Sequence, residues 1–187
     1  MIDDEGLITF LSFCAEKNMS VLVHPWDMLG KERLNKYMMG WTVGMMAETQ
    51  LSIVAMILGG SFDKIPASAN LKLCFAHGGG SFAFLLGRLE NAWTYRDLAR
   101  GKSQHPPSFY LDRFHVDSAV FDDDSLDLLV KKMSGEHVML GSDYPFPLGE
   151  QQIGSLVANS PYLSEETKEN ILYKNASSFF NIPVTPI

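Results

Sequence analysis

Cysteine, basic charge and long apolar runs are all scarce in this sequence. Its two cysteines, Cys14 and Cys74, lie within apolar patterns and lack CxxC spacing. Both are therefore expected to be buried thiols, and a disulfide or a zinc-finger site is disfavoured.

The charge balance is acidic, because 15 lysines and arginines face 22 aspartates and glutamates, which leaves a formal net charge of −7. No basic stripe runs along any expected helix, and phosphate neutralisation supplies most of the affinity for nucleic acid. No apolar run approaches the roughly 18 residues of a membrane span, and the N-terminus carries acidic residues where a signal peptide carries basic ones. We therefore expect no nucleic-acid partner, no membrane partner and a cytoplasmic location.

The composition that remains is that of an ordinary globular protein, with 187 residues of which 46% are hydrophobic and 20% are charged. Residues 1–187 are expected to form a single domain with a large core. This length falls below the roughly 200 to 250 residues of a complete (β/α)8 barrel.

Apolar periodicity predicts one helix followed by four repeats of strand and helix. The helices are predicted at 3–18, 45–58, 81–91, 123–135 and 165–180, and the strands at 20–23, 71–76, 109–116 and from 138. The Asp3–Asp4 pair, the acidic run 122–124 and Ser164 are expected to begin helices as N-caps. Strands that alternate with helices form a parallel sheet with helices outside it, so the predicted fold class is α/β.

Three of the expected strands are followed by a residue that can bind a metal or move a proton, namely His24, His77 and Asp143. Because parallel strands all point the same way, the three side chains are expected to face one mouth. Imidazole and carboxylate groups suit zinc and similar divalent ions. Two simpler interpretations stay open at this point. His24 could be a structural histidine, and Asp143 could cap the segment that follows it.

His77 stands out because three consecutive glycines, Gly78 to Gly80, follow it. Glycine is costly in backbone entropy, so we interpret the run as room for a substrate or a metal-bound water to approach the backbone. The remaining histidines are weaker candidates. His105 lies in a proline-rich loop, His115 is expected only to line a strand, and His137 precedes the last strand at its wrong end.

The segment 30–44 is polar, is punctuated by glycine and carries several bulky side chains. These features are typical of a loop that acts as a lid over a pocket. The next segment, 45–58, lacks glycine and proline and is predicted to be a mostly buried helix that ends at Gly59.

Three motifs carry a resemblance to a known family. They are HPWDM at 24–28, CFAHGGGSFAFLLGR at 74–88 and GSDYPFPLGE at 141–150. In order and spacing they resemble the aminocarboxymuconate-semialdehyde decarboxylases of the amidohydrolase superfamily, over essentially the whole chain. The resemblance implies a zinc-dependent enzyme with a (β/α)8 TIM-barrel type fold. Its implied reaction is the non-oxidative decarboxylation of 2-amino-3-carboxymuconate 6-semialdehyde in tryptophan catabolism by the kynurenine pathway, which limits quinolinate formation.

The resemblance also implies roles for individual residues. His24 and Asp143 would be zinc ligands, and His77 would be the catalytic acid/base. Arg88 would bind a carboxylate of the dicarboxylate substrate in the pocket of a neighbouring subunit, which implies a homodimer. The implied lining of the substrate pocket is Trp26, Met28 and Phe146.

The sequence departs from the family in one large respect. The family has a His-x-His pair that supplies two further zinc ligands, and this chain has none. The match covers only the C-terminal half of the barrel, about four βα units, so we expect a domain truncated at its N-terminus. A catalytic zinc takes about three protein ligands, and four strands cannot close a barrel. Two exposed sheet edges and an exposed apolar inner face are therefore expected.

Three functional hypotheses follow from this departure. The chain can be part of the decarboxylase and inactive without the remainder. It can instead be a catalytically dead half-barrel that acts as an interaction or partner subunit. It can also belong to a related decarboxylase or hydrolase of the same superfamily that acts on an aromatic acid.

Overall fold

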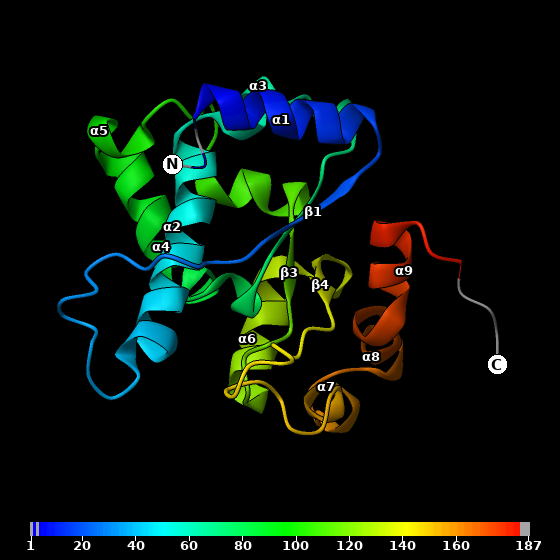
Figure 1. Cartoon of the computed structure of the whole chain (residues 1–187). Helices are drawn as coiled ribbons and strands as arrows, with labels where there is room; N and C mark the ends of the chain where they lie inside the picture. The colour runs from blue at the N-terminus through cyan, green and yellow to red at the C-terminus, as the bar shows by residue number, and fades with distance from the viewer. Residues whose placement is uncertain (1, 3, 184–187) are drawn as a thin grey trace.

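The sheet at the centre of the computed structural model has four parallel strands in the order β1-β2-β3-β4 (Figure 1). The structure describes residue 2 and residues 4–183. The strands are β1 (Ser20–Val23), β2 (Lys72–Phe75), β3 (His115–Asp117) and β4 (Val138–Met139). Ser20 is in register with Lys72, Cys74 with His115, and Val116 with Val138. The predicted α/β class with a parallel sheet is confirmed.

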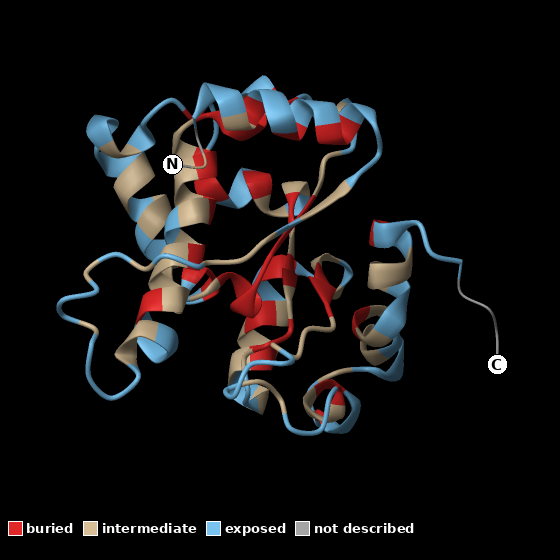
Figure 2. Cartoon of the chain, in the orientation of Figure 1, coloured by how far each residue is buried: buried red, intermediate tan, exposed pale blue. Residues whose placement is uncertain are grey.

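Helices cover one face of this sheet and bury the main core between them (Figure 2). They are α1 (Glu5–Glu16), α2 (Met45–Leu58), α4 (Phe82–Tyr95) and α6 (Asp123–Met133). Alternate strand residues point toward these helices, as the pleat requires. The strand side chains in this core are Leu73, Phe75, Val116 and Val138.

The opposite face of the sheet carries little cover. Cys74 and Met139 point to this side, where they are buried against Phe179 of α9 (Asn175–Phe180). Leu22, which alternates with the inward Val21 and Val23, is 57% exposed. The expected exposed inner face is thus present at Leu22, but the expectation is wrong at Cys74 and Met139 because α9 covers them.

The last helical segment also closes one edge of the sheet. It runs through α8 (Glu165–Glu169), a π-helical turn at Asn170–Lys174 and α9. Leu140 N–H donates to the carbonyl of Ile171 at 2.8 Å, and the side-chain amide of Asn175 donates to the carbonyl of Val138 at 2.7 Å. The expectation of two exposed edges is therefore wrong at β4. Within the described residues β1 pairs only with β2, so its outer edge has no strand beside it.

Most predicted elements are present with small shifts of their ends, but the strand predicted at 109–116 is wrong over most of its length. A 3-10 helix occupies Pro107–Arg113, and only His115–Asp117 is strand. Tyr110 is fully buried there, and its hydroxyl donates to Asp63 at 2.8 Å. Side-chain burial thus overrides the β propensity of this stretch. The sequence also did not predict α3 (Ser61–Lys64), α5 (Asp97–Arg100), α7 (Ser155–Asn159) or the 3-10 turns at 67–69, 77–79 and 135–137.

The expected N-caps form at three helices. Asp4 accepts from Gly6 N–H at 2.9 Å, and Asp122 accepts from Ser125 N–H at 3.0 Å. Ser164 accepts from Thr167 N–H at 3.2 Å. Asp3, the other member of the predicted pair, lies outside the described residues.

The predicted loop 30–44 is helical at its end, since Gly40–Gly44 forms a π-helical turn that continues into α2. By length and composition, the resulting 19-residue helical stretch Gly40–Leu58 could cross a membrane. This finding corrects the expectation that no segment is long and apolar enough to span a membrane. The buried core helix of a globular domain meets the same criterion, and Ile53, Met56 and Ile57 of this stretch are buried in the core.

Candidate metal centre at the strand ends

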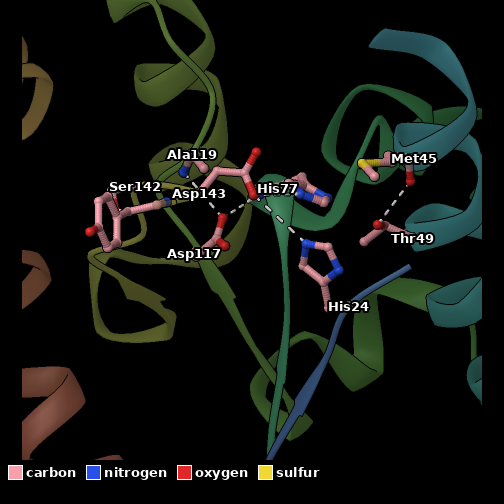
Figure 3. A network of polar contacts seen from close by, with 10 residues as sticks. His24, Met45, Thr49, His77, Asp117, Ala119, Ser142 and Asp143 are labelled. Carbon is pink, nitrogen blue, oxygen red and sulfur yellow. Dashed lines mark hydrogen bonds and ion pairs between the residues drawn. The ribbon is translucent and has the colours of Figure 1, made fainter. Parts of the chain in front are cut away.

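His24, His77 and Asp143 meet at the carboxyl end of the sheet, as the strand-end argument predicts (Figure 3). Their ligand atoms all lie within 4.8 Å of one another. Asp143 Oδ1 is 3.7 Å from His24 Nε2 and 3.5 Å from His77 Nε2. These separations are too long for good hydrogen bonds and close to the spacing of donors around one ion.

The nitrogens that face this point are unsatisfied. Within the described residues, His24 Nε2 and both ring nitrogens of His77 are buried and have no hydrogen-bond partner. Buried polar atoms of a native protein are nearly always paired, so an unpaired group of this kind requires an explanation. A bound divalent cation supplies one, because neutral imidazole and carboxylate are both metal ligands.

The backbone is strained at two of the three residues. His77 has φ +58° and Asp143 has φ +57°, a region that non-glycine residues seldom adopt. Strain of this type concentrates at functional sites, where the surrounding structure holds it in place.

The sequence also allows Asp143 to be a helix or turn cap, but among the described residues its side chain does not accept a capping hydrogen bond. Ser142, and not Asp143, accepts from the next backbone N–H, that of Tyr144.

The glycine run after His77 has a structural reason, while its interpretation as room for a substrate or water stays a prediction. All three glycines have positive φ. A Cβ on Gly80 would overlap the carbonyl oxygen of Met46 in α2, and one on Gly78 would overlap Val120. The run lets the chain turn tightly beneath the site, between α2 and the segment after β3.

Asp117 is the residue of this site that the sequence prediction missed. It ends β3, and its Oδ1 accepts from Gly78 N–H at 2.8 Å and from Ala119 N–H at 3.1 Å. A Cβ on Gly141 would lie 2.5 Å from the Cβ of Asp117, so the Gly-Ser-Asp step leaves space for this carboxylate. The sequence could have indicated Asp117, because it follows a predicted strand just as His24, His77 and Asp143 do.

Electrostatics favour a neutral imidazole at His77. Burial lowers the pKa of His77 from its ordinary value, and the neighbouring His24 lowers it further, while Asp117 and Asp143 oppose this shift. Burial also raises the pKa of Asp117. A neutral imidazole is the form that accepts a proton or binds a metal.

A pocket of about 290 Å³ opens beside the three side chains. Its walls are mainly apolar, and His77, Asp143 and Thr42 are its polar members. Trp41 and Thr42 come from the end of the predicted lid segment 30–44, which therefore does border the pocket. The apolar lining residues are Trp41, Met45, Met46, Phe121, Phe146 and Leu148.

The other predicted site residues are divided between the pocket and its surroundings. Phe146 lines the pocket and stacks on His24 with ring centroids 5.8 Å apart. Trp26 is 80% exposed, and Met28 packs against the turn at Gly44. Neither lines the pocket formed by the described residues. Arg88 lies exposed on α4 and is not a lining residue either.

The residues present fit a divalent metal ion. Donors at about 2.0–2.2 Å from a tetrahedral ion lie roughly 3.3 Å apart, close to the two separations measured here. The sequence prediction counted two ligands. The structure brings a third possible ligand, His77, to the same point.

Comparison with known proteins agrees with the predicted resemblance. The amidohydrolase family model matches residues 3–182. A 2-amino-3-carboxymuconate-6-semialdehyde decarboxylase of Dictyostelium discoideum is 45% identical over 97% of this chain and 50% of its own length. A Caenorhabditis elegans protein with the same name is 40% identical over 90% of this chain and 42% of its own length. The chain thus spans about half the length of the curated relatives it matches.

The fold is similar to that of a 5-carboxyvanillate decarboxylase from Novosphingobium aromaticivorans, whose crystal structure contains manganese and 4-hydroxy-3-methoxy-5-nitrobenzoic acid. The TM-score is 0.81 at 21% identity, over 97% of this chain and 53% of that one. A likeness at this identity concerns the fold alone, and coverage of half the longer chain accords with a partial barrel. With its parallel sheet, its strand-end cluster and a family model matched from residue 3 to 182, the chain belongs to the amidohydrolase family.

Proposed function

We propose that this chain supplies one half of the active site of a zinc-dependent decarboxylase that acts on 2-amino-3-carboxymuconate 6-semialdehyde in tryptophan catabolism. The observation that carries the proposal is the strand-end cluster, in which unpaired nitrogens of His24 and His77 converge with Asp143. The names of the relatives from D. discoideum and C. elegans support this substrate.

In this proposal His24 and Asp143 hold the metal ion. When bound, the ion supplies a Lewis acid beside the pocket. The related carboxyvanillate decarboxylase was solved with manganese. We favour zinc here, because the imidazole of His24 suits zinc, whereas manganese prefers oxygen ligands.

His77 acts as the acid/base. It is neutral near pH 7, because burial lowers its pKa, and its Nε2 faces the cluster. Loss of carbon dioxide breaks a carbon–carbon bond and leaves the electron pair on the substrate carbon, which must then gain a proton. A neutral histidine fixed beside that carbon can take up a proton from solvent and pass it to the carbon.

The pocket suits a flat, unsaturated acid. Trp41, Phe121 and Phe146 present aromatic surface to the space beside His77. Apolar walls exclude water and strengthen the interaction between the site's charges and the substrate carboxylates. An aromatic acid would fit the same description, so the alternative of a related aromatic-acid decarboxylase is decided by substrate assay.

Activity is proposed to need the remaining half of the barrel. The experiment is to express this chain with the half of the D. discoideum relative that it does not match, and to follow zinc content and the loss of substrate absorbance. We expect little turnover from the chain alone and turnover from the pair. Turnover by the chain alone, with one zinc per chain, would contradict the need for a second half. Assembly of an inactive pair would favour the dead partner subunit.

Two substitutions separate the roles within the active pair. Asp143→Ala is expected to lose zinc, whereas His77→Ala is expected to keep zinc and lose turnover by about 100-fold or more. His105→Ala, which belongs neither to the cluster nor to the pocket, is the matched control and leaves both unchanged. Loss of zinc in His77→Ala would make His77 a ligand and remove its proposed acid/base role.

We also propose that Arg88 binds a substrate carboxylate in the pocket of a second copy of the enzyme. Its exposed position on α4, away from the pocket of its own chain, supports this arrangement. An arginine offers two parallel hydrogen bonds to a carboxylate. Two inactive enzymes, Arg88→Ala and His77→Ala, are then expected to regain activity when their subunits are mixed, because the mixed dimer contains one intact site. No recovery after subunit exchange would place Arg88 outside the active site.

A further inference from the structure

A second pair of histidines lies at the opposite end of the sheet from the strand-end cluster. His115 opens β3 and His137 immediately precedes β4. The register that pairs Val116 with Val138 brings these two histidines side by side on neighbouring strands. Their ring centroids are 4.9 Å apart at an interplanar angle of 49°. Two imidazoles at this spacing can reach one ion.

The two histidine rings are fixed by packing, but each has a ring nitrogen without a hydrogen-bond partner among the described residues. Both are half-buried, and Phe179 packs edge-on against His115 at 5.1 Å. In the part of the chain that the structure describes, Nδ1 of His115 and Nδ1 of His137 are buried and have no hydrogen-bond partner. A buried nitrogen left unpaired costs about 1–3 kcal/mol. This cost falls on two adjacent side chains, which indicates a shared ligand.

The rings border a polar cavity of about 680 Å³. Asn18, Asn70 and Glu136 are among the side chains that line it. Their oxygens can accept hydrogen bonds from water molecules that complete the coordination of an ion. The cavity is therefore both roomy and polar enough for a hydrated ligand.

The charges favour a cation over an anion. Lys72 also lines the cavity, but its ammonium group already donates to Asn181 Oδ1 at 2.5 Å and to the carbonyl of Ser178 at 3.3 Å. Burial, with a smaller effect of His137, lowers the pKa of His115 to about 4, so this ring is neutral near pH 7. A neutral imidazole offers a lone pair to a metal and no charge to an anion.

We propose that His115 and His137 form a second metal site, separate from the strand-end cluster, for a borderline divalent ion such as Zn²⁺, Ni²⁺ or Cu²⁺. Imidazole is a preferred ligand of these ions. Two protein nitrogens hold the ion, and water fills the remaining positions. The site is weaker than the strand-end cluster, where the carboxylate of Asp143 adds a charged ligand beside imidazole.

Zinc titration of the chelator-stripped chain, followed by calorimetry, tests the proposal. We expect two classes of binding site in the unchanged chain, and two in the matched control His105→Gln, which changes an exposed residue whose ring stacks on Phe109. Asp143→Ala is expected to lose only the tighter class. His137→Gln is expected to weaken only the second class, by at least about tenfold. Two unchanged classes in His137→Gln, or a single class in the unchanged chain, would overturn the proposal.

A second measurement does not depend on the folding of a histidine variant in this region. Paramagnetic Ni²⁺ is added to Asp143→Ala, and the imidazole Cε1–H signals are followed by NMR. Broadening of the His115 and His137 signals at the lowest Ni²⁺ additions supports the site. Broadening of other histidines in their place, or uniform broadening of all of them, would contradict it.

Discussion

The contacts of a single glycine, Gly80, show why the segment after His77 cannot vary freely. Gly80 has φ +65°, and a side chain there would overlap the carbonyl oxygen of Met46. Gly87, in the middle of α4, has no atom within 4 Å of the position that a Cβ would take. The two positions therefore predict opposite effects of the same substitution.

Gly80→Ala is expected to destabilise the chain by about 2–4 kcal/mol, because it combines a forbidden backbone angle with a clash against fixed backbone. Gly87→Ala is expected to be neutral or to stabilise by up to about 1 kcal/mol, since alanine is the better helix former. Urea unfolding of the three proteins measures both values. Equal effects of the two substitutions would refute the proposed reason for the glycine run.

At the scale of residues, much of the candidate site could be predicted because strand ends are visible in the sequence. His24, His77 and Asp143 each follow a short apolar run, and parallel strands deliver such residues to one edge. The reason for the glycines could not be predicted, since the atoms that require them belong to Met46 and Val120. Asp117 also stands at a strand end, but its role could not be predicted, because its contacts to the backbone N–H groups of Gly78 and Ala119 are visible only in the structure.

At the scale of elements, the helical segment 165–180 does more than its sequence pattern indicates. Its π-helical turn frees the carbonyl of Ile171 to accept from Leu140, and Asn175 donates to the carbonyls of Gly135 and Val138, both at 2.7 Å. These bonds replace those of a neighbouring strand along β4. Periodicity predicted the helix, but not that its side would close the edge of the sheet.

Asn175→Ala is therefore expected to destabilise the chain by about 1–3 kcal/mol, because it removes the donor from two partly buried carbonyl groups. Amide hydrogen exchange at Leu140 should accelerate, since Leu140 donates to the same helical segment, which Asn175 holds against the edge of β4. Asn159→Ala is the matched control. Its exposed amide donates to the carbonyl of Ser155 within α7, so a change below about 0.5 kcal/mol is expected. Similar losses in both variants would mean that Asn175 does not hold the edge.

Strong periodic helices were predictable, whereas short or irregular elements were not. The helix 45–58 begins and ends as predicted, because nothing interrupts its apolar pattern before Gly59. The stretch 109–116 contains β-prone residues, yet Pro107 and the burial of Tyr110 turn most of it into a 3-10 helix. Local propensity does not indicate that the Tyr110 hydroxyl donates a hydrogen bond to Asp63, which is far away in the sequence.

At the scale of the whole molecule, the sheet is closed on one side and open on the other. The β4 edge is covered by the last helical segment, while β1 pairs only with β2 among the described residues, and Leu22 stays exposed beside it. The chain also spans about half the length of its relatives. The open β1 edge is thus where a further strand could continue the barrel, which is why activity is proposed to need a second half.

Tyr110 links distant parts of this chain and gives its global stability a dependence on alkaline pH. Its buried hydroxyl donates to Asp63 in α3 and accepts from His105 N–H at 3.1 Å. Burial, together with the bond to Asp63, raises the pKa of Tyr110 to about 12, whereas an unfolded tyrosine titrates near pH 10. The folded state thus favours the protonated phenol more strongly than the unfolded state does.

The sign of the effect follows from this difference. The contribution is fully present below about pH 10 and is lost as the pH rises from about 10 through about 12, because the unfolded state releases its proton first. After allowance for solvent screening, it amounts to about 1–2 kcal/mol. Tyr110→Phe, which cannot ionise, should be the less stable protein at pH 9 because Asp63 loses its donor. Urea unfolding from pH 9 to pH 11.5 should show the two stabilities converge, and parallel curves would mean that the Tyr110 hydroxyl does not control alkaline unfolding.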